Sequence, residues 1–309
     1  CMNDERILVL NNHQIDKTRW DETIDKSYNG LIYAYSWYLD LVSPGWHGLV
    51  SEGYKAVMPL TWRKKFGFEY LFPPFFTQQL GVFSRQHLNS EHIKVFIEKI
   101  PARYKFIDIN LNSENMFLPQ GFKFTKNINC TLSLNKNYEE IHNGYSQNLT
   151  RNLKKANGQH QLQVVGMKEA NALIKLFREN KGKKIKNLKD KEYEILSNLI
   201  NEAIERKMCE VYYAYHENRL VAGAVFLKTR HRITFLFSAV NTEGKHFLAM
   251  PVIVDRYISM HQKRDLIFDF EGSNNPELAR FYKSFGATEN IYLKIKKNNL
   301  PLPFRLLKK

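Results

Sequence analysis

The sequence predicts a mixed α/β protein built from two similar halves, because the same order of elements occurs twice. The first half carries apolar runs at residues 56–62 and 68–72 on either side of a basic turn. The second half carries such runs at residues 220–228 and 233–240, again around a basic turn. Each pair has the pattern of a β-hairpin. Repetition of one order of elements indicates two copies of one structural unit.

The elements after each hairpin repeat as well. A helical pattern and then a short apolar strand follow both hairpins, at about residues 90–100 and 106–110 and at about 249–262 and 266–270. Similar stretches come next, each followed by a predicted strand: residues 117–122 before a strand to about 134, and residues 281–286 before a strand to about 295. A hairpin, a crossover helix and a neighbouring strand describe a mixed sheet in each half.

The length of the chain agrees with two domains. The 309 residues, 43% of them hydrophobic, are enough for two cores of about 150 residues each. We place the domains at residues 1–137 and 138–309. No Gly/Ser-rich linker separates them, so we expect two packed halves.

The net charge of +15 favours polyanionic partners such as nucleic acid, phosphorylated cofactors or an anionic membrane face. Simple solubility explains such a charge equally well. No apolar run approaches the roughly 20 residues that span a bilayer, so we expect at most peripheral membrane contact. Cys130 and Cys209 stand singly, which favours a reducing compartment. We therefore expect a cytoplasmic protein without a metal site.

The second half begins with a predicted amphipathic helix. Ser146 can cap it, and Leu149, Leu153 and Ala156 form its apolar stripe. Arg151 lies on the opposite face with two lysines, and a lysine-rich stretch follows at residues 181–189. These cations can bind phosphate or simply face solvent.

Residues 267–287 give the strongest indication of a ligand site. A buried strand ends near Phe270, Asn275 is a good N-cap, and Pro276 suits the first position of a helix. Polar groups at the end of a strand, beside a helix N-terminus, commonly bind ligands in α/β sheets. A well-capped helix without a ligand is the structural alternative.

The run Phe281-Tyr282-Lys283-Ser284-Phe285-Gly286 resembles the last helix of GNAT acyltransferases. The resemblance implies an N-acyltransferase that uses an acyl-CoA thioester, such as acetyl-CoA, and a small-molecule or peptidic amine. It also implies that Tyr282 protonates the leaving group, because a phenol stays protonated at neutral pH. Asp269, like Asp108 in the first half, is a candidate general base or a cap of the following loop.

The same stretch resembles Fem-type peptidyltransferases, the tandem-GNAT enzymes that take amino acids from aminoacyl-tRNA. Phe281, Phe285 and Gly286 match their F-K-x-x-F-G element, although Lys283 stands one position after the lysine of that element. Matching stretches include Asp269-Phe270-Glu271-Gly272 and the basic run 146–156. Further matches in the first half are Trp46, Met58-Pro59-Leu60 and Gln78-Gln79-Leu80-Gly81. The fold implied is two tandem GNAT-like domains.

This chain departs from the family pattern in two places. The glycine-rich loop that cradles the CoA pyrophosphate has no match here, and residues 241–246 stand in its position. Lys245, His246 and Asn275 are the candidate cofactor contacts that remain. The long coiled-coil arm of many Fem enzymes has no counterpart in residues 168–206.

Three functions remain open on this basis. The first is acyl transfer from acyl-CoA to an amine, the second is Fem-like aminoacyl transfer from tRNA to a cell-wall or lipid-linked acceptor, and the third is binding of an anionic ligand without catalysis. The predicted substrate-binding residues are Lys283, Arg280, Arg151 and Glu271. The counterpart of Phe281-Tyr282-Lys283 in the first half is Phe117-Leu118-Pro119. It lacks the hydroxyl and the charge, so we expect a structural first domain that shapes the cleft wall.

Overall fold

The computed structural model describes residues 6–159, 161–272 and 274–307. Its contacts divide the chain into two compact units, one made of residues 1–127 with 291–309 and the other of residues 128–290. The units are defined by which residues contact one another, and unit 1 includes the C-terminal residues 291–309. The predicted domains are continuous stretches of sequence, so their boundary at residue 137 stays a prediction.

Unit 1, residues 1–127 with 291–309, contains two sheets. The first has the strand order β1-β2-β3-β6, and its pairs are antiparallel. In the second, β4 pairs antiparallel with β5, β5 pairs parallel with β7, and β7 pairs antiparallel with β14. The bounds of these elements are β1 (Ile7–Asn11), α1 (Lys17–Lys26), α2 (Ser36–Val42), β2 (His47–Ser51), β3 (Ala56–Leu60), β4 (Trp62–Lys65), β5 (Phe68–Leu71), β6 (Phe83–Ser84), α3 (Ser90–Glu98), β7 (Tyr104–Asn110), β14 (Thr288–Asn298) and α11 (Phe304–Leu307). Short 3₁₀ turns lie at Asn12–Gln14, Ile32–Ala34 and Glu52–Tyr54.

The helices of unit 1 cover a dense aromatic core. Asp16 caps α1 by accepting from the backbone N–H of Arg19, and the helix then buries Trp20 and Ile24. Trp20 and Trp46 are fully buried and lie 4.7 Å apart between ring centroids. This packing explains Trp46 as a core residue.

The hairpin expected from residues 56–62 and 68–72 is partly wrong. Residues 56–60 form β3, which pairs with β2 and β6 in the other sheet. The hairpin itself is β4–β5, closed by Phe66 and Gly67, both at positive φ. The apolar run in the sequence therefore covers two strands, because the chain changes sheets at Thr61.

Unit 2, residues 128–290, is built on one mixed sheet with the order β8-β13-β12-β11-β10-β9. The β12–β13 pair is parallel and the other pairs are antiparallel. The bounds are β8 (Lys123–Ser133), α4 (Tyr138–Asn143), α5 (Gln147–Gln159), β9 (Gln163–Met167), α6 (Asn171–Glu179), α7 (Asp190–Glu205), β10 (Cys209–His216), β11 (Arg219–Lys228), β12 (Arg232–Val240), α8 (Thr242–His246), α9 (Ala249–Met260), β13 (Ile267–Asp269) and α10 (Pro276–Ser284). A 3₁₀ turn lies at Gly182–Lys184.

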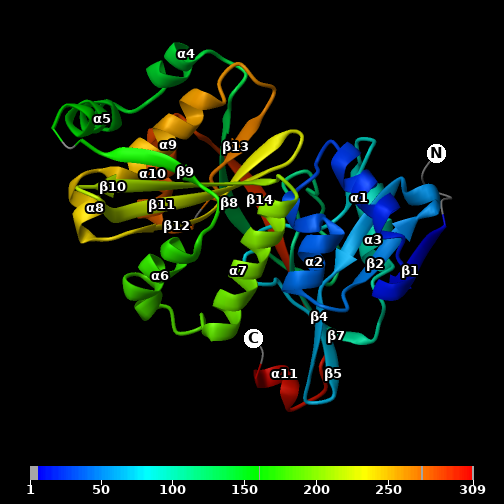
Figure 1. Ribbon diagram of the computed structural model, residues 1–309. Coiled ribbons are helices and arrows are strands. Elements are labelled where there is room, and N and C mark those ends of the chain that lie inside the picture. The colour runs from blue at the N-terminus through cyan, green and yellow to red at the C-terminus, as the bar shows by residue number, and fades with distance from the viewer. Residues whose placement is uncertain (1–5, 160, 273, 308–309) are drawn as a thin grey trace. The chain divides into compact units, whose positions relative to one another are not determined.

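Helices cover both faces of this sheet (Figure 1). On one face, Tyr257 of α9 stacks on Phe226 of β11 with 3.7 Å between ring centroids. On the other face, Phe177 of α6 lies 4.7 Å from Phe237 of β12. The helix α5 packs on α9 through Leu149 and Leu153, as its apolar stripe predicts.

The predicted order of hairpin, helix and parallel strand is present in both units, although the hairpin of unit 1 is shorter than expected. The hairpin β11–β12 is followed by α9 and by β13, which pairs parallel with β12. The hairpin β4–β5 is followed by α3 and by β7, which pairs parallel with β5. Each central strand takes its other neighbour from the distant part of the chain: β7 pairs with residues 294–298 of β14, and β13 pairs with residues 131–133 of β8. Mixed α/β architecture in two similar units is therefore the fold of this chain.

Candidate active site at the fork of unit 2

The central strands β12 and β13 of unit 2 separate after a short parallel contact. They pair only from Arg232 to Thr234, opposite residues 267–269, and β12 then continues for six residues while β13 ends. A register shift in the β11–β12 pairing leaves Leu236 as an extra residue, so β12 bulges where the strands part. We call the place where β12 and β13 separate the fork.

Tyr282 of α10 lies over the fork. Its ring is 6.5 Å from Phe235, the first residue of β12 beyond the paired segment, and 5.1 Å from Phe270, the first residue beyond β13. The spacing Leu278, Phe281, Tyr282 and Phe285 brings this ring to the sheet, because residues three and four apart share one face of a helix. Burial is the main cause that raises the pKa of the Tyr282 phenol far above its usual value of about 10, and the Glu271 carboxylate and Cys130 add to it. The hydroxyl is therefore protonated at every physiological pH.

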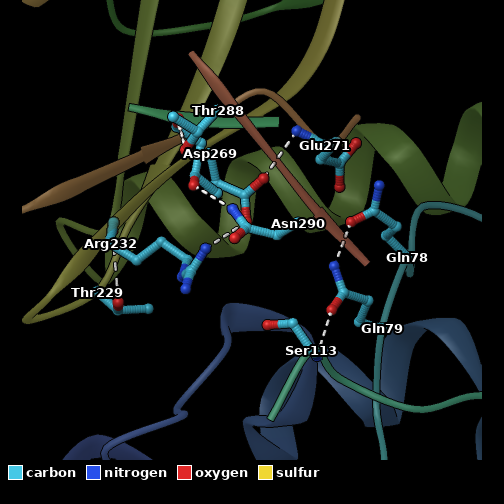
Figure 2. A network of polar contacts seen from close by, with 10 residues as sticks. Gln78, Gln79, Ser113, Thr229, Arg232, Asp269, Glu271, Thr288 and Asn290 are labelled. Carbon is cyan, nitrogen blue, oxygen red and sulfur yellow. Dashed lines mark hydrogen bonds and ion pairs between the residues drawn. The ribbon is translucent and has the colours of Figure 1, made fainter. Parts of the chain in front are cut away.

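Asp269 is the last residue of β13 and is 1% exposed. One carboxylate oxygen accepts from Arg232 Nη1 at 2.7 Å, and the other accepts from the backbone N–H of Glu271 at 2.8 Å (Figure 2). Both oxygens are thus used within the protein. The arrangement favours a positioning role, in which Asp269 ties β13 to β12 and fixes the turn that follows.

The turn after β13 explains the Asp-Phe-Glu-Gly run. Glu271 has φ of 55°, and Gly272 lies so close to β8 that an added Cβ would come within 2.2 Å of Asn129 Cα. Only glycine fits at that position. The half-buried Glu271 side chain lies at the end of β13 and influences the Tyr282 phenol. The structure therefore brings Tyr282, Asp269 and Glu271 together at the fork.

The N-terminus of α10 begins as the sequence predicts. Asn275 Oδ1 accepts from the backbone N–H groups of Glu277 and Leu278 at 2.9 and 3.4 Å, and Pro276 occupies the first turn. The Asn275 oxygen is thus engaged as a helix cap. Lys283 pairs with Glu289 at 3.0 Å on the exposed side of α10, and Arg280 is also exposed.

The segment after β12 does not fit a CoA pyrophosphate. It forms the short helix α8, where Asn241 Oδ1 accepts from the N–H of Gly244 at 2.7 Å. A Cβ on Gly244 would come within 2.3 Å of the Val221 carbonyl oxygen, so this glycine serves packing against β11. Glu243 adds a carboxylate, paired with Arg219 at 2.7 Å. Lys245 and His246 are exposed on α8, and the acidic side chain beside them opposes phosphate binding.

The remaining predicted cations lie away from the fork residues in the fold of unit 2. Arg151 is exposed on α5. The Ser146 hydroxyl caps this helix by accepting from the backbone N–H of Leu149 at 3.2 Å. The lysines at residues 181–189 are exposed as well. No contact in unit 2 joins these side chains to Tyr282 or Asp269 among the described residues.

Unit 1 contains a separate polar network, also drawn in Figure 2. Gln79 donates to Gln78 Oε1 at 2.6 Å and accepts from the N–H of Ser113 at 3.0 Å. The adjacent Gly81 has φ of 97°, and a Cβ there would come within 2.4 Å of Asn115 Oδ1. The Gln-Gln-Leu-Gly run thus ties two loops together within unit 1.

The described ranges hold neither a metal-binding cluster nor a membrane-spanning helix. They contain no group of three or more His, Cys, Asp or Glu side chains arranged to hold a metal ion. Nor does any helix in them have the length and apolarity that crossing a membrane requires.

The sequence alone did not identify the fork. In the sequence, Arg232 belongs to the basic turn of the hairpin, so nothing indicates its ion pair with Asp269. The extra residue Leu236 looks like one more apolar position of the strand. The continuous run of Phe235, Leu236 and Phe237 was the available signal, since three successive large apolar residues suggest a strand covered on both faces. The separation of β12 from β13 depends on which residues of the two strands pair, and no local sequence pattern encodes that.

Comparison with known proteins gives one family match. Residues 144–283 match the acetyltransferase (GNAT) domain model, which covers most of unit 2 and includes Tyr282. No curated protein matches the sequence at a significant level.

Solved structures resemble the whole chain in fold. FemX superimposes with a TM-score of 0.67 at 14% identity, over 98% of this chain and 99% of its own. The C-terminal domain of a putative lysylphosphatidylglycerol synthetase from Agrobacterium fabrum gives 0.57 at 10% identity, over 96% and 95%. A tandem GNAT protein from the clavulanic acid biosynthesis pathway gives 0.53 at 10% identity, over 96% and 99%. At these identities the likeness concerns the fold.

Proposed function

We propose that the fork of unit 2 transfers an aminoacyl group from tRNA to an amine. Residues 144–283 match the acetyltransferase (GNAT) domain model, and the chain has the fold of tandem GNAT proteins. The observation that carries this proposal is that two features occur together in unit 2. A protonated tyrosine lies over the separated strands, and the neighbouring segment does not fit a CoA pyrophosphate.

The fork supplies what attack of an amine on an ester requires. Beyond Thr234, the edge of β12 on the side of β13 pairs with no strand among the described residues, and its backbone N–H groups can polarise a carbonyl oxygen as charge develops on it. The amine nitrogen bonds to the carbonyl carbon while the bond from that carbon to the leaving ribose oxygen breaks. Tyr282 gives its proton to that oxygen, and the amine proton passes to the Glu271 carboxylate. The exchange of these protons through solvent restores both side chains.

The high pKa of Tyr282 matches an oxygen leaving group. A general acid must hold its proton at the working pH and give it to the leaving group in the transition state. An alkoxide is far more basic than a thiolate, because the parent thiol has a pKa of only about 8.5. The partly buried phenol of Tyr282, whose pKa is raised by burial, keeps its proton at neutral pH and can donate it to a ribose oxygen as that basic oxygen departs.

The segment around α8 supports the same choice of donor. Acyl-CoA needs backbone N–H groups directed at its pyrophosphate, whereas here the N–H of Gly244 is bonded to Asn241 and Glu243 stands beside it. A tRNA donor is held along its backbone by dispersed cations instead. The net charge of +15 and the exposed cations on α5 and at residues 181–189 provide these.

The acceptor is an amine on a peptide or a lipid-linked group. The name of the lysylphosphatidylglycerol synthetase, a protein related in fold, describes a lysyl group on a lipid headgroup, which supports an aminoacyl donor and a lipid-linked acceptor. Asp269 acts as a positioning residue in this proposal, because its ion pair with Arg232 holds the end of β13 at the fork.

The test measures transfer from two donors in parallel. Total tRNA charged with labelled amino acids and labelled acetyl-CoA are each incubated with the protein and with a lysine-containing peptide or UDP-N-acetylmuramyl pentapeptide. We expect label on the amine only from the charged tRNA, with binding that weakens steeply as salt rises.

Two other outcomes would contradict the proposal in different ways. Transfer from acetyl-CoA alone would restore the acyl-CoA reaction expected from the sequence. Saturable binding of charged tRNA without transfer to either acceptor would favour the binding protein without catalysis.

A further inference from the structure

The β4–β5 hairpin meets the segment after β14 at one end of unit 1 (Figure 1), and exposed apolar side chains are found on both. Phe66 at the hairpin turn is 71% exposed, Leu302 is 71% exposed, and Leu306 of α11 is 67% exposed. Phe68 and Phe304 lie beneath them. We call Phe66, Phe68, Leu302, Phe304 and Leu306 the apolar tip.

Packing contacts within unit 1 hold the residues of the apolar tip together. The ring of Phe304 lies 6.1 Å from Phe66 and 5.3 Å from Phe68, so α11 is joined to the hairpin through aromatic contacts. A cavity of about 160 Å³ lies between them, lined also by Tyr70, Phe106 and Leu300. The side chains that face outward from this small core are the most exposed large hydrophobic residues of the described chain.

Phe66 is not explained by the folding of the hairpin. The turn consists of Phe66 and Gly67, both at positive φ, where asparagine, aspartate or glycine is favoured. A phenylalanine there is strained and leaves its ring in water. A residue that strains its turn and leaves most of its ring exposed is a candidate for contact with a partner.

The charges around the apolar tip are positive. Arg63, Lys64 and Lys65 are exposed on β4, and Arg305 is exposed on α11. The Lys65 ammonium lies 5.2 Å from the centre of the Phe66 ring, so the cation and the aromatic ring face the same region. Glu69 on β5 is the nearby acid, and it pairs with Arg103 at 3.3 Å.

We propose that the apolar tip inserts into the headgroup region of an anionic lipid membrane, with Lys64, Lys65 and Arg305 on the phosphates. Aromatic and leucine side chains enter the interface between headgroups and acyl chains, and lysine and arginine beside them contact anionic lipid. A hairpin turn with a short helix is too small for a stable protein interface, which buries about 800 Å² per partner. This proposal concerns unit 1 alone and holds whichever group the fork of unit 2 transfers.

The experiment is sedimentation of the full chain with vesicles of phosphatidylcholine alone or with one third phosphatidylglycerol. We expect binding to the anionic vesicles and at least about tenfold weaker binding to the neutral ones. The double variant Phe66→Ser, Leu306→Ser should bind anionic vesicles at least about tenfold more weakly than the wild type, and Lys64→Gln, Lys65→Gln should reduce binding and its salt dependence together.

The matched control is Met116→Ser, Leu118→Ser, which removes two other exposed hydrophobic residues of unit 1 (52% and 53% exposed). It should bind as the wild type does. Equal loss in the control, or no binding of the wild type to anionic vesicles, would overturn the proposal. Sedimentation velocity without vesicles provides the other decisive outcome: a wild-type dimer that the Phe66 and Leu306 substitutions convert to monomer would assign the apolar tip to contact between copies of the chain.

Discussion

The two units share an order of elements but differ at the end of their central strands. In unit 2, β13 ends at the buried Asp269, a tight turn follows, and α10 brings Tyr282 over the fork. In unit 1, β7 carries the partly exposed Asp108, paired with Lys294 at 3.0 Å, and residues 117–122 form no helix. The unit that retains the helix and the buried ion pair is the one with groups suited to chemistry.

This difference indicates how one fold can serve two purposes. A helix after the central strand needs a cap, a turn and an apolar face, and unit 2 has all three in Asn275, Gly272 and the stripe ending at Phe285. Unit 1 has Pro119 where the helix would continue, and Pro disfavours a helix interior. We therefore expect substitutions at equivalent places to act much more strongly in unit 2.

The largest expected effect is on the two aspartates. Asp269→Ala leaves Arg232 without its partner near the core, and breaking a buried ion pair costs about 3–5 kcal/mol. Asp108→Ala breaks a pair that solvent reaches, for which the cost is below about 1 kcal/mol. Urea unfolding of both variants measures the difference, and equal losses would contradict the asymmetry between the units.

A smaller effect is expected at two glycines. Gly272→Ala places a Cβ within 2.2 Å of Asn129 Cα in addition to the strain of positive φ, so we expect a loss of about 3 kcal/mol. Gly121→Ala in unit 1 also stands at positive φ, but nothing lies within 4 Å of its added Cβ, and about 1 kcal/mol is expected. The midpoints of thermal unfolding rank the two, and a larger loss at Gly121 would show that the close approach to β8 is not limiting.

The smallest effect concerns two buried histidines. Burial, with Arg103 beside it, lowers the pKa of His47 in unit 1 from about 6.5 to about 4. The pKa of His261 in unit 2 is also lowered by burial, but Glu210 opposes this shift. Because the unfolded chain takes up these protons more readily, the stability due to His47 is present above pH 6.5 and is lost as pH falls towards 4.

The variant His47→Gln should therefore flatten the dependence of stability on pH between 6.5 and 4, by on the order of 2 kcal/mol across that range. His261→Gln should flatten it less. Urea unfolding at several pH values provides the comparison, and an unchanged slope in His47→Gln would assign the acid sensitivity to other groups.

Much of the fold follows from local patterns. The hairpin β11–β12, the capped helices α5 and α10, and the repeated helix-strand pairs were predicted because their periodicity and caps are encoded in adjacent residues. The sheet change at Thr61 was missed, since an apolar run does not show which neighbour each of its residues pairs with. The exchange of β8 and β14 between distant parts of the chain was missed for the same reason.

The candidate site was predicted in part. The sequence and the family resemblance singled out Tyr282 and Asp269, and the structure gathers both at the fork with Glu271. Lys245, His246 and Asn275 stay predictions as cofactor contacts, as do Lys283, Arg280 and Arg151 for the substrate. Arg232 had no recognisable signal, because its importance lies in a partner 37 residues away in the sequence.

The most direct test of the central claim is aminoacyl transfer by Tyr282→Phe, measured with charged tRNA in single-turnover conditions beside the control Tyr212→Phe. Tyr212 lies on the same face of the sheet, and its hydroxyl contacts only the Met260 sulfur at 3.7 Å among the described contacts. The account predicts a rate about 100-fold lower for Tyr282→Phe, with unchanged tRNA affinity and a wild-type rate for Tyr212→Phe. Equal rates in all three proteins, or transfer from acetyl-CoA but not from tRNA, would contradict it.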